Sequence, residues 1–341
     1  MKMHCCCCLL LAVMAACCGG CWSPAASEVI VYTSEDSEFS EPIFADFTAQ
    51  AGVAVRPKFD AESTKTVGLA AEIVKESSRP QCDVFWNNEV LNTLRLERQG
   101  LLEIYRPAAA QRYPAAYRSP RATWYGFAAR ARVLVVNHQV VPKDQWPTSI
   151  FDLADGRWKG RTAMAKPLFG TTATHAACLF AHLGSDKAKD FFRRLKTNQV
   201  QIVSGNKQVA LAVATGRAAF GITDTDDAIE EVDKGQPIEI VYPDQATGQI
   251  GTLFIPNTVA VIRGCPHPES ARRLVDFLLS AETEAKLALG PSAQIPLGAG
   301  VAAKPRVETA ETVRAMAVDF DAAAAKWDET ARFLKEEFTG D

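Results

Sequence analysis

The sequence predicts an α/β protein built from two lobes. A chain of 341 residues is longer than a protein with a single hydrophobic core usually is, so the length favours two domains or one bilobal fold. Its composition, 48% hydrophobic and 23% charged, is typical of a globular chain. Short apolar runs alternate with helical segments, which favours parallel strands joined by right-handed crossovers. Because such sheets bind ligands beyond the carboxyl ends of their strands, we expect a ligand cleft where strand ends of both lobes meet.

The first part of the chain contains three strand–helix pairs. A strand is expected at 29–32, where Val-Ile-Val-Tyr forms a run of high β propensity. A helix is expected at 37–50, with Pro42 near its first turn and Gly52 beyond its end. The other elements of this series are strands at 53–59 and 83–86 and helices at 64–77 and 88–99.

A second series of strands and helices follows. Gly184 and Gly235 end two of its helices, and Ser185 caps another. The expected strands lie at 132–136, 161–165, 199–203, 218–222, 238–242 and 258–262. The expected helices lie at 171–183, 185–196, 206–214, 226–234, 269–279, 282–289, 310–316 and 319–338.

The first 21 residues are typical of a secretory signal peptide. Lys2 supplies a positive start, and an apolar run too short to span a bilayer precedes small residues and cysteines. Met-Ala-Ala-Cys, ending at Cys17, resembles the lipoprotein cleavage box, so we expect lipidation of Cys17; Cys18 and Cys21 are the alternatives. A lipid anchor would hold the mature chain at a membrane surface, in the periplasm or on the cell surface.

Charge and cysteine content exclude two classes of protein. The formal net charge is −3 without a basic stripe, so we expect no nucleic-acid partner. Seven of the ten cysteines lie in the first 21 residues, and no C-x-x-C pair follows them, which disfavours a structural zinc site. The sequence does not decide whether Cys82 and Cys265 form a disulfide. Cys178 lies in an apolar helical run and is expected in the core.

Acidic residues follow two of the expected strands. Ser34, Glu35 and Asp36 come directly after the first strand, where they could contact a ligand or cap the next helix. Asp224-Thr-Asp-Asp, which contains Thr225, Asp226 and Asp227, places three carboxylates within four residues. Their repulsion would be offset by a bound cation or by an amine of the ligand; the alternative is an acidic helix start.

A threonine-rich loop precedes the helix expected at 171–183. Thr171 and Thr172 could hold a phosphate, phosphonate or carbonate group with their hydroxyl and backbone N–H groups, or could simply cap the helix. Trp86 and Phe169 could line a cleft or pack in the core, and His175 is expected to be a satisfied polar residue rather than a ligand.

Five stretches between residues 28 and 290 carry a family resemblance. They are Val29-Ile-Val-Tyr-Thr-Ser-Glu-Asp, Cys82-Asp-Val-Phe-Trp-Asn-Asn-Glu, Ala129-Arg-Ala-Arg-Val-Leu-Val-Val-Asn, Gly205-Asn-Lys-Gln-Val-Ala-Leu-Ala-Val-Ala-Thr-Gly running into Ala219-Phe-Gly-Ile-Thr-Asp-Thr-Asp-Asp, and His267-Pro-Glu-Ser-Ala-Arg-Arg-Leu-Val-Asp-Phe-Leu-Leu-Ser. In order and spacing they resemble the extracellular solute-binding proteins of bacterial ABC importers, specifically the ferric-iron-binding group with the type II periplasmic binding protein fold. The resemblance implies two lobes joined by two hinge crossovers, lobe 1 at 28–128 plus 254–296 and lobe 2 at 129–253 plus 297–341.

The resemblance also implies positions for ligand residues. Asp36 stands in the first βα loop, and Asn88 follows the third strand with Glu89 beside it. Thr225 and Asp226 stand where the family has paired tyrosines, so the phenolate ligands of iron are not preserved. Carboxylate oxygens suit ferric iron, and they would come from Asp36, Glu89, Asp224 and Asp226. The family binds an anion at the loop of Thr171 and Thr172, and Arg130 at the hinge crossing could pair with it.

These observations predict a monomeric solute-binding protein that delivers its cargo to an ABC permease and ATPase. The expected cargo is ferric iron with phosphate or carbonate, and the alternatives are an aminoalkylphosphonate, a sugar phosphate or a polyamine. A metal-dependent hydrolase using Asp224, Asp226 and His175 is the alternative of another class. The sequence contains no G-x-S-x-G, H-E-x-x-H, Walker or dinucleotide-binding motif, so we expect no enzyme and no resident cofactor.

Overall fold

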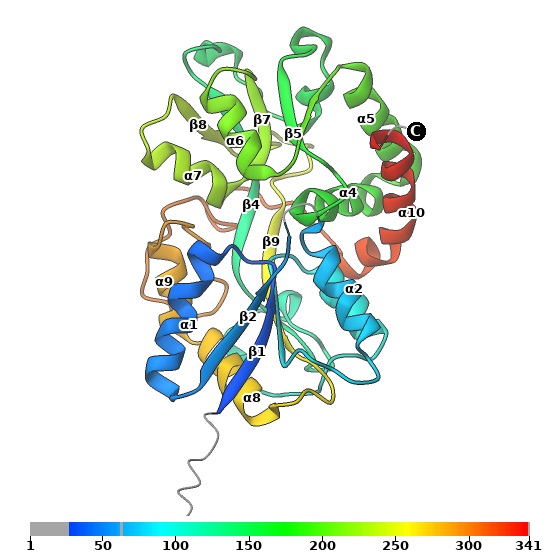
Figure 1. Cartoon of the computed structure of the whole chain (residues 1–341). Helices are drawn as coiled ribbons and strands as arrows, with labels where there is room; N and C mark the ends of the chain where they lie inside the picture. Colours follow the sequence, from blue (N-terminus) through cyan, green and yellow to red (C-terminus); the bar gives the residue numbers. More distant parts are fainter. Residues whose placement is uncertain (1–26, 62–63, 340–341) are drawn as a thin grey trace, which may run out of the picture.

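A computed structural model describes residues 27–61 and 64–339 of the chain. Its strands form one curled nine-stranded sheet in the order β2-β1-β3-β9-β4-β7-β5-β6, with β8 paired to β4. Helices cover both faces of the sheet, which narrows between an upper and a lower half (Figure 1). The expected signal peptide, the expected lipobox and the expected lipidation of Cys17 lie outside the described residues.

The lower half is built from the first strand–helix series. Strands β1 (Glu28–Thr33), β2 (Ala54–Phe59) and β3 (Val84–Asn87) pair in parallel, as predicted. Helices α1 (Ser37–Ala51), α2 (Val67–Lys75) and α3 (Leu91–Arg98) connect them to the next elements. Gly52, with a φ of 66°, ends α1 in the left-handed conformation that glycine adopts without a steric penalty.

The upper half is built from the second series. Strands β5 (Thr162–Ala165), β6 (Gln201–Val203) and β7 (Phe220–Asp224) are parallel, and β8 (Ile238–Val241) runs antiparallel to β4. The helices are α4 (Gly170–Leu183), α5 (Ser185–Thr197), α6 (Asn206–Ala214) and α7 (Thr225–Asp233). Short 3₁₀ turns lie at Ala108–Arg112, Ala115–Tyr117, Lys143–Gln145, Ile150–Ala154 and Gly156–Trp158.

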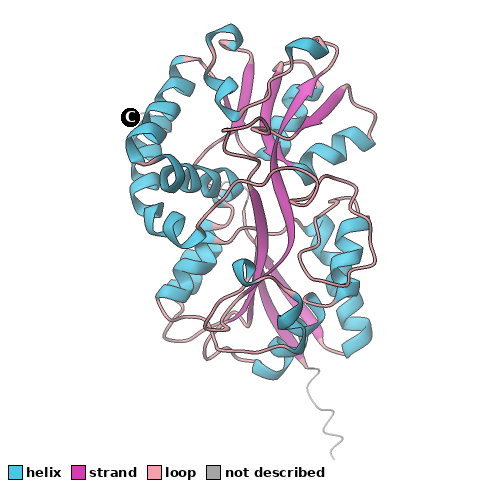
Figure 2. Cartoon of the chain, turned by 180° about the vertical axis from the view of Figure 1, so that it is seen from behind, coloured by secondary structure: helices cyan, strands magenta, loops and turns pink. Residues whose placement is uncertain are grey.

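Two long strands run from one half of the sheet to the other. Strand β4 (Tyr125–Asn137) pairs with β9 (Phe254–Val261) along its first part and with β7 along its second (Figure 2). The sequence predicts only 132–136 and 258–262 of these strands. Glycine and alanine weaken the local signal in the first part of β4, and Pro256 and Asn257 weaken it in the first part of β9.

The C-terminal segment confirms the helices expected at 269–279, 282–289 and 319–338 as α8 (Pro268–Leu278), α9 (Ala281–Leu289) and α10 (Phe320–Phe338). The helix expected at 310–316 is wrong. Thr252 N donates to the carbonyl of Arg314, and Met316 N donates to the carbonyl of Thr252, so this segment is held as a β-bridge instead. Helix α10 then packs against α4, α5 and α3 and so contacts both halves (Figure 1).

The core lies on both faces of the sheet and contains the three described cysteines. Cys82, Cys178 and Cys265 are buried free thiols, so the structure contains no disulfide between Cys82 and Cys265. Cys178 is fully enclosed, as predicted. Among the described residues, no helix has the length and apolar character needed to cross a membrane.

Candidate ligand-binding cleft

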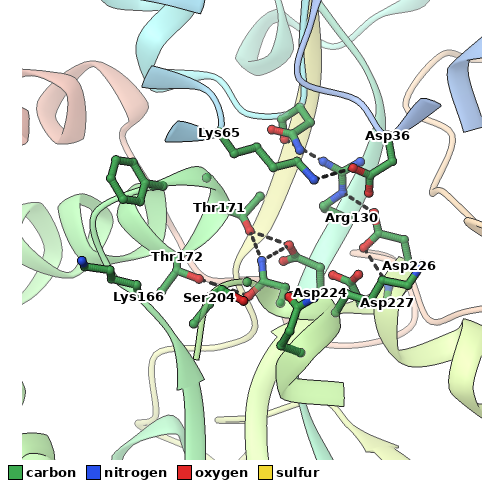
Figure 3. Close-up of a pocket in the computed structure, with 18 of the residues that line it drawn as sticks. Asp36, Lys65, Arg130, Lys166, Thr171, Thr172, Ser204, Asp224, Asp226 and Asp227 are labelled. Carbon is green, nitrogen blue, oxygen red and sulfur yellow. Dashed lines mark hydrogen bonds and ion pairs between the residues drawn. The ribbon is translucent and has the colours of Figure 1, made fainter. Parts of the chain in front are cut away.

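A cavity of about 370 Å³ lies between the two halves, at the carboxyl ends of the parallel strands. Helices α1, α4, α6 and α7 all contribute their first turns to its wall (Figure 3). Phe169 and Gly205, at the N-cap positions of α4 and α6, have no side-chain acceptor that could cap these helices. Gly170 N donates to the carbonyl of Lys65, and the other first-turn N–H groups of α4 and those of α6 are suited to an anionic group of a ligand.

The opposite wall of the cavity is acidic. Asp224 ends β7, and Asp226 and Asp227 lie in the first turn of α7; their carboxylate oxygens lie within 4.8 Å of one another. Burial is the main cause that raises the pKa of Asp226 to about 7, and the neighbouring carboxylates Asp224, Glu35 and Asp36 add to it. Burial and the same kind of repulsion raise the pKa of Asp227 well above its usual range. A cationic group placed here would relieve both penalties.

Arg130 joins the two halves at the floor of the cleft. Its Nη1 donates to the Asn88 carbonyl at 2.7 Å and its Nη2 to Glu35 Oε2 at 2.8 Å, both in the lower half. Its Nε lies 2.9 Å from Asp226 Oδ2 in the upper half. Because the guanidinium is only 2% exposed and already has these partners, it neutralises carboxylates rather than offering a free anion site.

Arg132 holds several residues of the cavity wall in place, and the sequence analysis missed it. It is fully buried, and its Nη1 donates to Asp224 Oδ1 at 2.8 Å, to Thr171 Oγ1 at 3.1 Å and to Asn206 at 3.0 Å. Its Nη2 donates to Thr172 Oγ1 at 3.2 Å. Asp224 also accepts hydrogen bonds from Thr171 and Asn206, so its carboxylate is fully engaged by the protein. The alternation of side chains along β4 was the only available signal for Arg132.

Three lysines that line the cavity, Lys65, Lys166 and Lys207, supply further positive charge. Lys207 is paired with Glu38 and Glu230. Lys65 Nζ lies 2.6 Å from Asp36 Oδ1, and Figure 3 shows this ammonium group at the edge of the acidic wall. Lys166 lines the cavity as well and extends away from Asp224, Asp226 and Asp227 (Figure 3). Ser204 completes the wall beside α6. The sequence analysis missed these residues as well, because isolated lysines carry no motif.

Several residues expected at the site support it from behind. Ser34 Oγ donates a hydrogen bond to Asn87 Oδ1 and accepts one from Asn88 N. The carboxylate of Glu35 accepts hydrogen bonds from the side chains of Arg130 and Gln294. Thr225 Oγ1 accepts from Ala131 N of β4. Of the expected residues, those that line the cavity are Asp36, Asn88, Arg130, Thr171, Thr172, Asp224, Asp226 and Asp227.

Glu89 needs a correction, because the structure places it outside the cavity wall. Its carboxylate is fully buried and accepts hydrogen bonds from Leu91 N and Asn92 N at the start of α3. Thr174 Oγ1 of α4 donates to it as well, at 2.8 Å. Glu89 thus caps α3 and joins two helices, and it has no open oxygen for a metal ion.

Of the two aromatic residues and the histidine considered from the sequence, only Phe169 lines the cavity. Phe169 lines the cavity, whereas Trp86 is buried in the core, where it packs against Phe44 and Phe127. His175 faces a small apolar pocket between α4 and α5, and burial together with Arg132 lowers its pKa to about 3. A hydrolase that joins His175 to Asp224 and Asp226 therefore does not fit this arrangement.

Two α/β halves with a cleft at their strand ends define a bilobal binding protein. The sequence pattern of the family described as "Bacterial extracellular solute-binding protein" matches residues 83–325, more than half of the chain. The chain therefore belongs to this family, and its fold is that of type II periplasmic binding proteins, as the resemblance implied.

Individual relatives differ in what they bind. The chain is 26% identical over 287 residues to "Iron uptake protein A1" of Synechocystis sp., covering 80% of this chain and 77% of that protein. It is 24% identical to a "Putative 2-aminoethylphosphonate-binding periplasmic protein" of Salmonella paratyphi A, covering 77% of each. Iron-bound HitA from Pseudomonas aeruginosa superimposes with a TM-score of 0.81 at 23% identity, covering 90% of this chain and 99% of that one. The class is thus a solute-binding protein of the ABC-importer type, and the relatives are binding proteins rather than enzymes.

Proposed function

We propose that this protein captures a small zwitterionic solute carrying an ammonium group and a phosphonate or phosphate group, such as an aminoalkylphosphonate. The observation that carries the proposal is the polarity of the cleft. Carboxylates of Asp226 and Asp227 line one wall, and the uncapped N-termini of α4 and α6 line another. An ammonium group would bind the first wall and the anionic group the second.

The charge balance supports an ammonium group as the cation. Five carboxylates at the acidic end, Glu35, Asp36, Asp224, Asp226 and Asp227, face three protein cations, Lys65, Arg130 and Arg132. The formal charge of this cluster is therefore −2 when all groups are ionised. One ammonium group would reduce this excess, and it can donate to several carboxylate oxygens at once.

The size of the cavity also supports an organic cargo. A volume of about 370 Å³ falls in the range of sites that enclose small organic molecules, and it greatly exceeds that of a bare metal ion. One relative is described as binding 2-aminoethylphosphonate, a solute with both required groups.

Calorimetric titration tests this proposal. We expect 2-aminoethylphosphonate to bind with a dissociation constant of about 1 μM or below, and ethanolamine or inorganic phosphate alone to bind at least about a hundredfold more weakly. Asp227→Asn should weaken 2-aminoethylphosphonate binding about tenfold or more. Asp233→Asn is the matched control, because Asp233 lies on the same helix but outside the cavity wall, paired with Arg306. Equal affinity for the zwitterion and its fragments would refute the proposal.

Ferric iron with a synergistic anion is a second candidate cargo. The observation that favours it is the carboxylate trio Asp224, Asp226 and Asp227, whose oxygens lie close enough to share one ion. This trio differs from the metal ligands expected from the sequence, because it contains Asp227 and lacks Asp36 and Glu89. Against it, Asp224 and Asp226 are already paired with Arg132 and Arg130, and no tyrosine is among the described residues that line the cavity.

Competition separates the two candidates. Ferric citrate would be titrated into the protein with and without phosphate, followed by 2-aminoethylphosphonate. If iron is the cargo, it should bind with phosphate and block the zwitterion; binding of the zwitterion alone would favour the first candidate.

The remaining parts of the proposal concern delivery. The cleft would close around the cargo by a hinge in β4 and β9, with lobe boundaries at the predicted positions, and the closed monomer would dock on an ABC permease driven by its ATPase. A lipid at Cys17 would hold the protein at the membrane. Processing that globomycin blocks, and that Cys17→Ser abolishes, would test the anchor; continued lipid labelling of Cys17→Ser would move it to Cys18 or Cys21.

A further inference from the structure

Lys65 occupies a position at which one side chain can control the charge accepted by the cleft. It lies between β2 and α2 in the lower half, yet its backbone carbonyl accepts a hydrogen bond from Gly170 N of α4 at 3.0 Å. Its Nζ forms the ion pair with Asp36 at 2.6 Å and lines the cavity. The side chain is 17% exposed, so its charge acts in a partly desolvated site.

Two hydrogen bonds hold the backbone at Lys65 and Thr66 against neighbouring elements. Thr66 has a φ of 70° and a ψ of −31°, which is costly for a β-branched residue. It is nevertheless fully buried, and its hydroxyl accepts a hydrogen bond from Asn92 Nδ2 at 3.3 Å. These contacts and the bond to Gly170 fix where the Lys65 side chain leaves the backbone. The ammonium group is therefore presented to the cleft by a built turn.

The charges around the ammonium group come from both halves. Asp36 contacts it directly, and Asp226 and Asp227 face the same cavity from α7 (Figure 3). Lys65 acts on Asp227 in the opposite sense to the carboxylates, since it favours the ionised form. Arg130 and Arg132 are engaged by Glu35, Asp226 and Asp224. Lys65 is thus a protein cation whose ion-pair partner Asp36 is itself part of the cavity wall.

We propose that Lys65 is a specificity-determining residue that excludes dicationic and more highly charged cargo from the cleft while admitting a zwitterion. The inference rests on the proposed function, because it concerns the same cavity. A solute with one ammonium group and one anionic group meets both signs of charge in the wall. A diamine or a multivalent cation would place a second positive charge in a site where Lys65 already supplies one, and repulsion of this kind is how sites reject near-relatives of their ligand.

The test compares 2-aminoethylphosphonate with putrescine in the wild type, Lys65→Met and Lys65→Gln. We expect either substitution to tighten putrescine binding and to shift the putrescine-to-zwitterion affinity ratio by about tenfold or more. Lys65→Arg keeps the charge and should keep the wild-type ratio. Lys75→Met is the matched control, because it removes a lysine at the exposed end of α2, away from the cleft.

The outcomes separate this inference from the proposed function. If the wild type fails to bind 2-aminoethylphosphonate but Lys65→Met gains putrescine affinity, the proposed cargo is wrong and the role of Lys65 stands. If the wild type binds the zwitterion, and the affinities for the zwitterion and for putrescine change by the same factor in Lys65→Met and Lys65→Gln, Lys65 has only a structural role. Unchanged or undetectable putrescine binding in both variants would overturn the inference as well.

Discussion

Replacing Arg132 tests the central structural claim about the cleft, that Asp224 is held by the protein rather than left open for cargo. Arg132→Met keeps a long side chain but removes the hydrogen bonds that Arg132 donates to Asp224, Thr171, Thr172 and Asn206. The side chains of Arg132 and Asp224 are 0% and 5% exposed. Removing one partner of a buried ion pair typically costs about 3–5 kcal/mol, because the other charge stays desolvated and unpaired.

The expected loss lies near the lower end of this range. Asp224 keeps its hydrogen bonds from Thr171 and Asn206, so we expect a loss of about 3 kcal/mol in the free energy of unfolding. For a chain of this size that corresponds to a decrease in Tm of roughly 4 °C. Urea unfolding followed by tryptophan fluorescence would measure the change, with calorimetry for the Tm.

Two further variants make the result interpretable. Arg132→Met combined with Asp224→Asn removes both charges and should recover at least about half of the lost stability. Arg56→Met is the control, because Arg56 is 67% exposed in its ion pair with Glu28 and should change stability by about 0.5 kcal/mol or less. A cost of less than about 1 kcal/mol for Arg132→Met, or a double variant no more stable than the single one, would show that Arg132 does not hold Asp224 in this way.

Three other outcomes follow from the same site. Affinity for an ammonium-bearing cargo should fall as the pH drops below about 7, because Asp226, whose pKa is about 7, then becomes neutral. Binding titrations between pH 5.5 and pH 8.5 would measure this change. An affinity that does not vary with pH would count against an amine bound to this wall. Asp227→Asn should raise the Tm of the cargo-free protein at pH 8 but not at pH 4: the raised pKa means that the folded state holds this proton more tightly than the unfolded chain, so the penalty of ionisation develops only as the pH rises. Glu89→Gln should lower stability by about 2 kcal/mol, because its carboxylate receives the N–H groups of Leu91 and Asn92, and should leave cargo affinity unchanged within about twofold; loss of binding without loss of stability would return Glu89 to the site.

The fold could be predicted from the sequence because its signals are local. Runs such as Val29–Tyr32, periodic helices and stop glycines such as Gly52 specify strand–helix alternation, and that alternation implies parallel strands. The error at 310–316 has a non-local cause. Its backbone hydrogen bonds go to Thr252, about sixty residues away, and no local pattern announces that partner.

The candidate site could be predicted only in outline. Asp36, Asp226 and Thr171 follow strand ends or begin helices, so their place at the cleft followed from the topology. Which acids remain open depends on contacts between distant segments. Asp224 is neutralised by Arg132 of β4, and Glu89 is enclosed by the start of α3 and by Thr174 of α4.

The sequence by itself determined the order of strands and helices, and through it the edge of the sheet at which polar side chains gather. Only the tertiary structure decided the charge that each of those side chains presents to a ligand. The physical reason is that helix and strand formation depend on neighbours a few residues apart, whereas the state of a buried carboxylate depends on the cations and N–H groups that folding brings within about 3 Å. Lys65 shows this difference. No pattern in the sequence distinguishes it from other lysines, but in the folded chain it lies against Asp36, beside the first residue of α4.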